Sequence, residues 1–316
     1  MGFTGQAHIL DRLRKEIRND TLGHAYAFTG VKGIGKRTLA RYIAKTILCA
    51  GKDNDMQPCG RCRPCRSFDE GANPNFRLIR NETQNILISQ IRELIDDISI
   101  RPAEGRKVYL IEDADLMTTQ AQNCLLKTLE EPPEYGVIFL TTSVYESLLP
   151  TVRSRVAQLR LKPYSVMEIM TIAHEKGIDL SGKEYLVGLS GGIPGRVFGL
   201  AADKSFEENR NKVMSFVFEG NMFSRLELNR FLSGNRDAFR SCLDILESVY
   251  RDVLLVQCSA GDGLINSDKQ DNIIKYAKEF SPVDIMEKIK GIRDIRKNLK
   301  RHMNYQLAVD MLTLAV

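Results

Sequence analysis

The sequence predicts an α/β domain with a largely parallel sheet, followed by a region made entirely of helices. Short apolar runs typical of buried strands recur between helical patterns, near residues 25–29, 76–80, 107–111, 137–142 and 157–161. A glycine-rich loop joins the first of these strands to an amphipathic helix. From about residue 205 onward only helical patterns remain, and their apolar faces are wide.

Breaks in these patterns divide the chain into three predicted parts: residues 1–163, 164–204 and 205–316. Pro163 interrupts the strand pattern, and Ser165 then opens a helix through a capping box with Glu168. In the last part, one predicted helix has a broad apolar stripe formed by Phe239, Cys242, Leu243, Leu246, Val249, Tyr250, Val253 and Leu254. Most of such a stripe forms a core, but several helices of this kind can also pack between subunits.

Residues 30–36 read Gly-Val-Lys-Gly-Ile-Gly-Lys, a Gly-x4-Gly-Lys phosphate loop. The glycines let backbone N–H groups approach phosphate, and Lys36 reaches the outer phosphates. Arg37 stands where the motif has Ser or Thr, whose hydroxyl normally holds magnesium. Thr38 carries the nearest hydroxyl, about 100° further round the helix. The candidate site for ATP and Mg²⁺ comprises Gly30, Gly33, Gly35, Lys36, Arg37 and Thr38. A chance glycine-rich turn is the alternative.

A pair of acids, Glu112 and Asp113, follows the apolar run 108–111. In P-loop enzymes a carboxylate at this strand end holds magnesium, and a second one positions the attacking water. The usual order is Asp then Glu, so the order here is inverted. We treat Arg37 and the inverted pair as two independent departures, both of which predict weak or absent ATP hydrolysis. A solvated strand end is the alternative.

Four cysteines form a second candidate site within residues 49–65. Cys59, Cys62 and Cys65 have Cys-x2-Cys-x2-Cys spacing in a loop rich in Gly, Pro and Asp, and Cys49 lies upstream. Four thiolates close a tetrahedral, structural zinc site. An iron–sulfur cluster is the first alternative, although its fourth cysteine would lie just downstream and precede proline. Disulfides are the second.

The opening residues have no basic or apolar segment of a secretion signal, which predicts a cytoplasmic protein with reduced thiols. The three remaining cysteines, Cys124, Cys242 and Cys258, are predicted to be buried small hydrophobes. The 316 residues include 45 basic and 40 acidic ones, a net charge of +5 that permits but does not demand nucleic-acid contact. No apolar stretch is long enough to cross a membrane.

Seven further segments along the chain carry distinctive residues. In order they are Gly5-Gln6, Gly23-His24-Ala25-Tyr26, Asn73-Pro74-Asn75, Arg101-Pro102-Ala103-Glu104-Gly105, the run from Leu125 to Pro133, Thr151-Val152-Arg153-Ser154-Arg155-Val156, and Asn304-Tyr305-Gln306-Leu307-Ala308. With the phosphate loop and the cysteines, they resemble the clamp-loader family of bacterial DNA polymerase III. The run Leu-Leu-Lys-Thr-Leu-Glu-Glu-Pro-Pro is the strongest match, and the resemblance covers essentially the whole chain.

The resemblance implies an AAA+ fold, in which a RecA-like P-loop domain with an embedded zinc module is followed by a helical lid and an all-α collar for oligomerisation. It implies a five-membered ring with gamma/tau and delta subunits, which opens the sliding clamp and places it on primed DNA. Polymerase activity would belong to the whole assembly, because nothing in this chain resembles a nucleotidyl-transfer site.

Two kinds of ring subunit share these segments. The motor kind keeps Thr after the loop lysine and an Asp-Glu pair, whereas this chain resembles the other kind at both places and in its length. The resemblance therefore implies little or no intrinsic ATPase activity. One alternative is an ATP-hydrolysing motor subunit, in which the two acids exchange roles. Another is a zinc-dependent nucleic-acid-binding module with a vestigial nucleotide fold.

The resemblance also assigns roles to single residues. In the family, a Ser-Arg-Cys motif supplies an arginine finger to ATP on the neighbouring subunit, and Ser154-Arg155-Val156 matches it with Val in place of Cys. Arg155 is therefore the expected finger, with Arg153 as the local alternative and a surface ion pair as the structural explanation. Thr142, with Thr141 before it, matches a sensor of the γ-phosphate, and Arg196 matches a second sensor in the lid.

Overall fold

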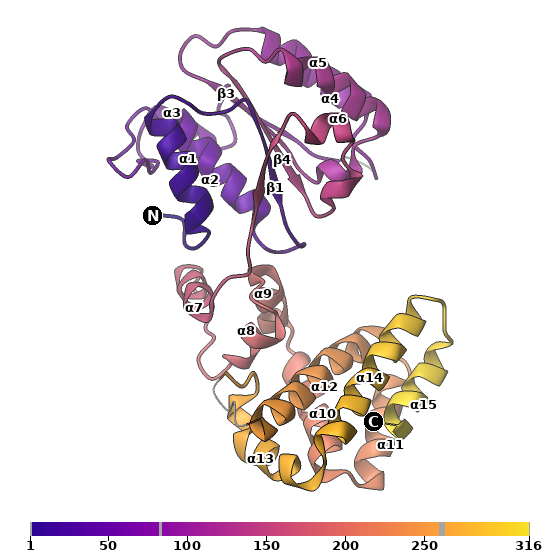
Figure 1. Ribbon diagram of the computed structural model, residues 1–316. Helices are drawn as coiled ribbons and strands as arrows, with labels where there is room; N and C mark the ends of the chain where they lie inside the picture. Colours follow the sequence, from indigo (N-terminus) through magenta and orange to yellow (C-terminus); the bar gives the residue numbers. More distant parts are fainter. Residues whose placement is uncertain (1, 82–83, 259–262, 316) are drawn as a thin grey trace. The chain divides into compact units, whose positions relative to one another are not determined.

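The computed structural model describes residues 2–81, 84–258 and 263–315. The chain forms two compact units, Met1–Tyr164 and Ser165–Val316 (Figure 1).

The first unit is built on a five-stranded parallel sheet with the strand order β2-β3-β4-β1-β5. Its strands are β1 (Ala25–Thr29), β2 (Phe76–Ile79), β3 (Lys107–Ile111), β4 (Gly136–Thr142) and β5 (Ala157–Arg160). The central strands β1, β3 and β4 are buried at every position, as expected for parallel strands covered on both faces. Because β4 pairs with both β1 and β3, the loops that follow these three strands meet at one edge of the sheet.

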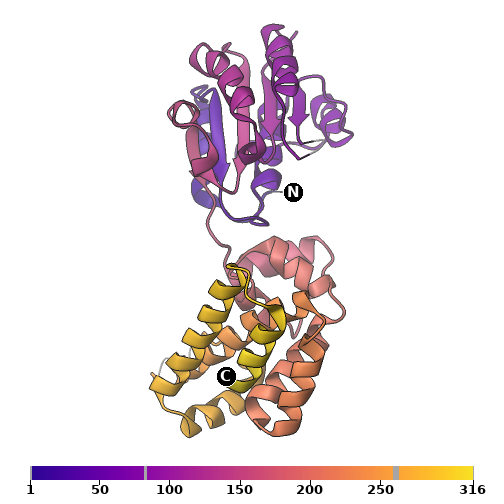
Figure 2. The same ribbon diagram turned by 90° about the vertical axis from the view of Figure 1, so that its right-hand side faces the viewer.

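Helices cover both faces of this sheet (Figures 1 and 2). They are α1 (Ala7–Arg18), α2 (Lys36–Leu48), α3 (Arg63–Asp69), α4 (Ile88–Ser99), α5 (Thr119–Glu130) and α6 (Pro150–Arg153), with 3-10 turns at η1 (Ala114–Leu116) and η2 (Tyr145–Ser147). Figure 1 shows α1 to α3 on one side of the sheet and α4 to α6 on the other. Alternate strand residues such as Tyr109 and Ile138 share a core with Leu94 of α4 and Leu125 of α5. The predicted parallel α/β architecture is confirmed.

The second unit is entirely helical in its described residues, as predicted. Its helices are α7 (Val166–Glu175), α8 (Tyr185–Leu189), α9 (Pro194–Ala202), α10 (Phe206–Glu219), α11 (Met222–Leu232), α12 (Arg236–Gln257), α13 (Gln270–Glu279), α14 (Pro282–Leu299) and α15 (Tyr305–Ala315), with η3 at Ser267–Lys269. The long helix α12 packs against α10, α13 and α14. The predicted capping box is present, because Ser165 accepts from the Glu168 N–H while the Glu168 carboxylate accepts from the Ser165 N–H.

Contacts between α8 and the later helices join residues 165–204 to the C-terminal helices. Arg210 of α10 is buried, and its guanidinium lies 3.7 Å from the ring centroid of Tyr185 of α8. Gly188 leaves room for Ile265, whose side chain would lie 2.8 Å from an added Cβ. These contacts explain why residues 165–316 form one compact unit, and the finer division near residue 204 stays a prediction.

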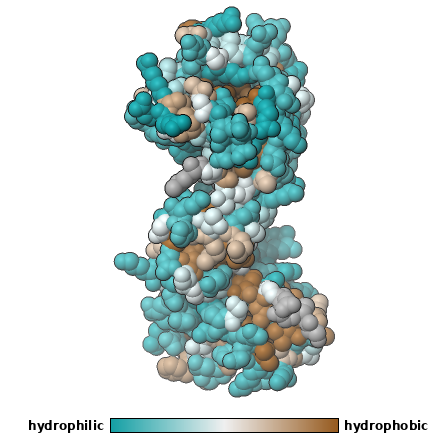
Figure 3. Space-filling view, turned by 90° about the vertical axis from the view of Figure 1, so that its left-hand side faces the viewer, coloured by the Kyte–Doolittle hydropathy of each residue, from teal (hydrophilic) through white to brown (hydrophobic). Residues whose placement is uncertain are grey.

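Hydrophilic side chains cover much of the face shown in Figure 3, interrupted by hydrophobic residues on the helical unit. Cys242 is buried, as predicted, but Cys124 is only partly buried. The prediction for Cys258 is wrong, because this residue follows the last turn of α12 and is exposed. Within the described part of the chain, no helix combines the length and the apolar character needed to span a membrane.

Candidate functional site

The glycine-rich loop lies between β1 and α2, at the edge of the sheet where the strands end. Gly33 and Gly35 have φ angles of 87° and 100°, a left-handed conformation that favours glycine. A cavity of about 310 Å³ lies against the loop. Its lining residues are Lys32, Gly33, Gly35, Lys36, Arg37, Thr38, Glu112, Asp113, Thr141 and Ser143. The fold thus brings the phosphate loop, the Thr38 hydroxyl and the acidic pair together, because β1 and β3 flank β4.

Lys36 is buried and folds back over its own loop. Its Nζ donates hydrogen bonds to the carbonyl oxygens of Gly30 (2.8 Å) and Val31 (3.2 Å) and to Ser143 Oγ (2.9 Å). Burial lowers the pKa of Lys36, although the charges of Asp113 and Asp115 oppose this shift. The lysine therefore closes the loop on itself, and a phosphate would have to replace these protein oxygens.

Arg37 pairs with Glu112, so the two departures from the P-loop motif are in direct contact and are not independent. Arg37 Nε lies 2.6 Å from Glu112 Oε1, and the Glu112 side chain is only 9% exposed. The contact is an ion pair without a directed hydrogen bond to Oε1. Burial raises the pKa of Glu112, which the Arg37 charge opposes. A cation of the chain itself therefore faces the strand-end carboxylate, and these residues do not fit a magnesium ion in the usual P-loop arrangement.

The hydroxyl side chains at the end of β4 that line the cavity are not the one expected to sense the γ-phosphate. Thr142 is fully buried and its Oγ1 accepts from the Val144 N–H at 3.0 Å, so it does not line the cavity. Thr141 does, and its Oγ1 accepts from the N–H of Asp113, a residue with a left-handed φ of 49°. Ser143 is the residue that sequence reasoning missed. Its position directly after the apolar run near 137–142 was the available signal.

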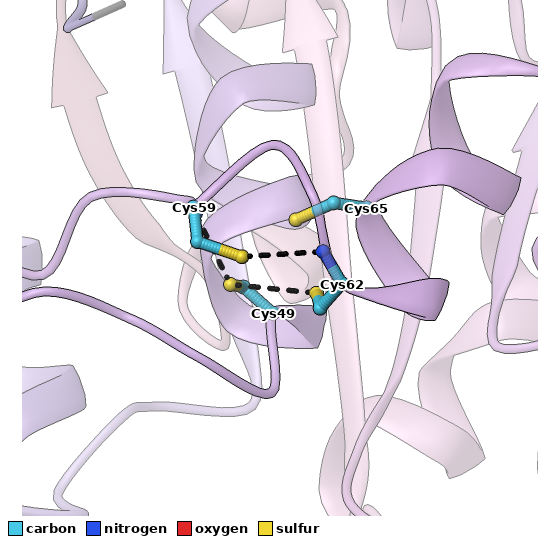
Figure 4. Close-up of side chains that lie close together, drawn as sticks. All are labelled: Cys49, Cys59, Cys62 and Cys65. Carbon is cyan, nitrogen blue, oxygen red and sulfur yellow. Dashed lines mark hydrogen bonds between the residues drawn. The ribbon is translucent and has the colours of Figure 1, made fainter.

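The four predicted cysteines converge at one point (Figure 4). Cys49 follows the last turn of α2, Cys62 caps α3 and Cys65 lies in its first turn, while Cys59 comes from the loop between these helices. Their sulfur atoms all lie within 4.8 Å of one another, with 3.8 Å between those of Cys49 and Cys62. A tetrahedral zinc ion with Zn–S bonds of about 2.3 Å places its sulfurs roughly 3.8 Å apart. The four thiols therefore fit a metal ion such as zinc.

Backbone N–H groups around the cluster favour thiolates at two positions. Burial raises the pKa of Cys62, but N–H groups including that of Ala50 outweigh it and lower the value to about 6. N–H groups of the same loop also lower the pKa of Cys59. Burial raises the pKa of Cys49, and that of Cys65 to about 12. A bound cation would supply the positive charge that these two buried sulfurs lack.

Arg155 lies just beyond α6, at the surface of the first unit. Its guanidinium lies 2.7 Å from Glu130 at the end of α5, and it donates to the Thr151 carbonyl (2.9 Å) and to Ser154 Oγ (3.1 Å). The side chain is 34% exposed. Arg153, the local alternative, instead packs over the Tyr145 ring, with a buried Nε.

Arg196 is in the first turn of α9, in the second unit. It lines a cavity of about 560 Å³ formed within that unit, together with α12 and α14 residues such as Arg251 and Arg293. Its expected role beside a nucleotide stays a prediction.

A parallel α/β unit with a phosphate loop after β1 and an acidic pair after β3 defines the class of P-loop α/β proteins. Residues 5–165 match the family described as "DNA polymerase III, delta subunit", and residues 206–315 match "DNA polymerase III, delta subunit, C terminal". The chain therefore belongs to the DNA polymerase III delta subunit family, as a clamp-loader subunit of the delta-prime kind.

Known proteins are similar to the chain over different lengths. It is 29% identical to DNA polymerase III subunit delta' of Bacillus subtilis (strain 168), covering 98% of this chain and 95% of that protein. It is 38% identical to the tau/gamma subunit of Haemophilus influenzae over 168 residues, 52% of this chain and 24% of that protein. The crystal structure of a gamma subunit-related protein from Thermotoga maritima covers 96% of this chain and 97% of its own, with 18% identity and a TM-score of 0.42.

Proposed function

We propose that this subunit serves the clamp-loader ring as a structural and arginine-donating member, with little or no ATP hydrolysis of its own. It assembles with gamma/tau and delta subunits in the cytoplasm, and the ring loads the sliding clamp onto primed DNA. The observation that carries the proposal is the Arg37–Glu112 ion pair at 2.6 Å, which involves both positions that would bind magnesium in an active P-loop. ATP chemistry in the ring then depends on the neighbouring subunits.

The contribution of this chain to that chemistry is Arg155, acting in trans. A guanidinium is planar, permanently charged and able to stabilise the charge that develops during phosphoryl transfer. Three contacts orient Arg155 at the end of a short helix, and one of them is an ion pair with a half-exposed Glu130. Such an ion pair is weak in water, so the guanidinium can exchange it for a phosphate at little cost.

Exposed apolar side chains of the second unit support its role in assembly. Helices α11 and α15 pack together through hydrogen bonds from Asn229 to Asp310 and Thr313. Their large exposed hydrophobic residues are Met222, Phe223, Leu226, Leu307, Met311 and Leu314. Apolar side chains concentrated on adjoining helices are typical of subunit interfaces. We assign them to contacts with other ring subunits.

The four-cysteine cluster is proposed to hold a structural zinc ion. Four sulfur ligands leave no open position for a substrate, so the ion stabilises the fold and takes no part in catalysis. Zn²⁺ fits the observed sulfur spacing and needs no redox partner.

The test of the proposal is ATP turnover by a ring reconstituted with Arg155→Ala. We expect the ATP turnover of the ring to fall by the fraction that the single ATP site completed by Arg155 contributes. An arginine finger contributes about 10³-fold or more to turnover at its own site, so that site should become nearly inactive. Arg155→Lys should restore little, since an ammonium group lacks the planar fork. Arg12→Ala is the matched control, because Arg12 is half-exposed and makes a similar ion pair with Glu16 at 2.8 Å. Unchanged turnover in a ring shown to be intact would refute the role of Arg155.

The alternative, a motor subunit, is tested with the purified chain alone. Magnesium-dependent ATP turnover that disappears in Lys36→Ala would establish an intrinsic ATPase. We expect no turnover, both in the wild type and in the Lys36 variant.

A further inference from the structure

The fold family implies a magnesium ion at the phosphate loop, and the residues of this chain disagree with that ion in a specific way. Magnesium requires oxygen ligands at about 2.0–2.1 Å in octahedral geometry. The loop supplies a guanidinium in place of its hydroxyl ligand, and the carboxylate of Glu112 already faces Arg37 Nε at 2.6 Å. A second cation placed between them would be repelled by Arg37 and would lack one of its two protein ligands.

The cavity nevertheless keeps the parts of the loop that bind phosphate directly. The left-handed glycines hold the backbone in the phosphate-loop shape, and the N-terminus of the long helix α2 points at the cavity. Three cations, Lys32, Lys36 and Arg37, line it together with two carboxylates, Glu112 and Asp113, of which Glu112 is paired with Arg37. The Arg37 side chain lines the cavity and is 55% exposed, so the N–H donors that do not face Glu112 remain available to an anion. This set of cations and donors suits an anion that brings no metal.

We propose that Arg37 takes the place of magnesium, so that the cavity binds the polyphosphate of a metal-free nucleotide. The inference rests on the proposed function, in which this site does not hydrolyse ATP, and it adds the chemical state of the ligand. A metal-free diphosphate brings its full negative charge to Lys36 and Arg37. A magnesium-bound diphosphate brings a dication next to the guanidinium and therefore gains nothing from the metal.

The test is calorimetric titration of the full purified chain with ADP, once in excess EDTA and once in excess Mg²⁺. For the wild type we expect binding in EDTA that is as tight as in Mg²⁺, or tighter. Arg37→Thr restores the missing hydroxyl and removes the cation. In this variant we expect Mg²⁺ to tighten ADP binding by about tenfold, equivalent to one charge-assisted contact.

Two further variants keep the result interpretable. Arg37→Lys retains a cation and should remain insensitive to magnesium, whereas Arg37→Ala should lose about tenfold of its affinity in EDTA, because it supplies neither cation nor hydroxyl. Thermal unfolding of each variant shows whether it is folded. Wild-type binding that tightens in Mg²⁺ overturns the substitution of metal by Arg37, and the absence of ADP binding in both buffers overturns the polyphosphate site. Neither result involves the ring, so both are distinct from a failure of the Arg155 proposal.

Discussion

Replacing one cysteine of the cluster tests whether a metal holds the segment between α2 and α3. The substitution is Cys65→Ser, which removes the sulfur of a residue that is 1% exposed and leaves the other three sulfurs in place. Serine is nearly isosteric but a poor zinc ligand, so the substitution removes a ligand with little change in packing.

The size of the effect follows from the chain that the cluster closes. Cys49 and Cys65 enclose the 15 residues 50–64. No helix or strand is present between α2 and α3, a stretch that the structure describes completely, and hydrogen bonds such as Met56 N–H to the Asp53 carbonyl are local. A cross-link around a loop of this length contributes about 3 kcal/mol in the chain-entropy treatment. For a unit of this size, that corresponds to a fall of roughly 6–12 °C in melting temperature.

The assay combines zinc analysis by mass spectrometry with thermal unfolding followed by circular dichroism. The wild type should carry about one zinc ion per chain, as a closed four-sulfur site does. Cys124→Ser, at a partly buried cysteine outside the cluster, is the control and should keep both the metal and the stability. If Cys65→Ser retains its zinc, or has the same melting temperature as the Cys124 variant, the cluster is not a metal centre that stabilises the fold.

Two further substitutions test the packing of each unit. Although burial opposes it, the hydrogen bond from Tyr109 (2.5 Å) and nearby cations hold the pKa of Asp97 below its usual range. Asp97→Asn should therefore lower the free energy of unfolding by about 1–2 kcal/mol at pH 7. In denaturant titrations this difference should shrink as the pH falls below about 4 and Asp97 becomes protonated in the folded state, and a constant difference would contradict the assignment. In the second unit, Arg210→Ala should cost about 3 kcal/mol, the lower end for a buried pair because Asp268 is 35% exposed. The exposed Arg240→Ala should change stability by less than about 0.5 kcal/mol, and equal effects of the two would refute the role of the buried pair.

The sheet could be predicted from the sequence because buried parallel strands are nearly continuous apolar runs. The run near 107–111 coincides with β3, and those near 76–80 and 137–142 differ from β2 and β4 by one residue at one end. The apolar stripe of α12 was predicted equally well from its helical spacing, since seven of its eight residues are buried and only Leu254 is partly exposed. The spacing of the four cysteines also predicted their clustering correctly, because a short loop and the start of α3 keep their sulfur atoms close to one another.

Contacts between distant segments could not be predicted in the same way. Thr142 and Ser143 are neighbours in sequence, yet one turns into the core and the other meets Lys36. Alternation along the strand puts Thr141 and Ser143 on the same side and Thr142 on the other, but the sequence does not say which side faces the cavity. Likewise, no local pattern pairs Tyr185 with Arg210, the contact that joins α8 to the helical bundle.

The ion pair between Arg37 and Glu112 changes how the two departures from an active phosphate loop are understood. Taken separately, each substitution weakens magnesium binding, so reverting either one alone would partly restore it. In the structure each residue neutralises the other, and the carboxylate is buried enough that its pKa is raised even beside the guanidinium. Reverting Arg37 alone leaves Glu112 without this counter-charge, which a cation from solution can then supply. The two positions form one electrostatic unit, so the effect of changing either residue on magnesium binding depends on the other.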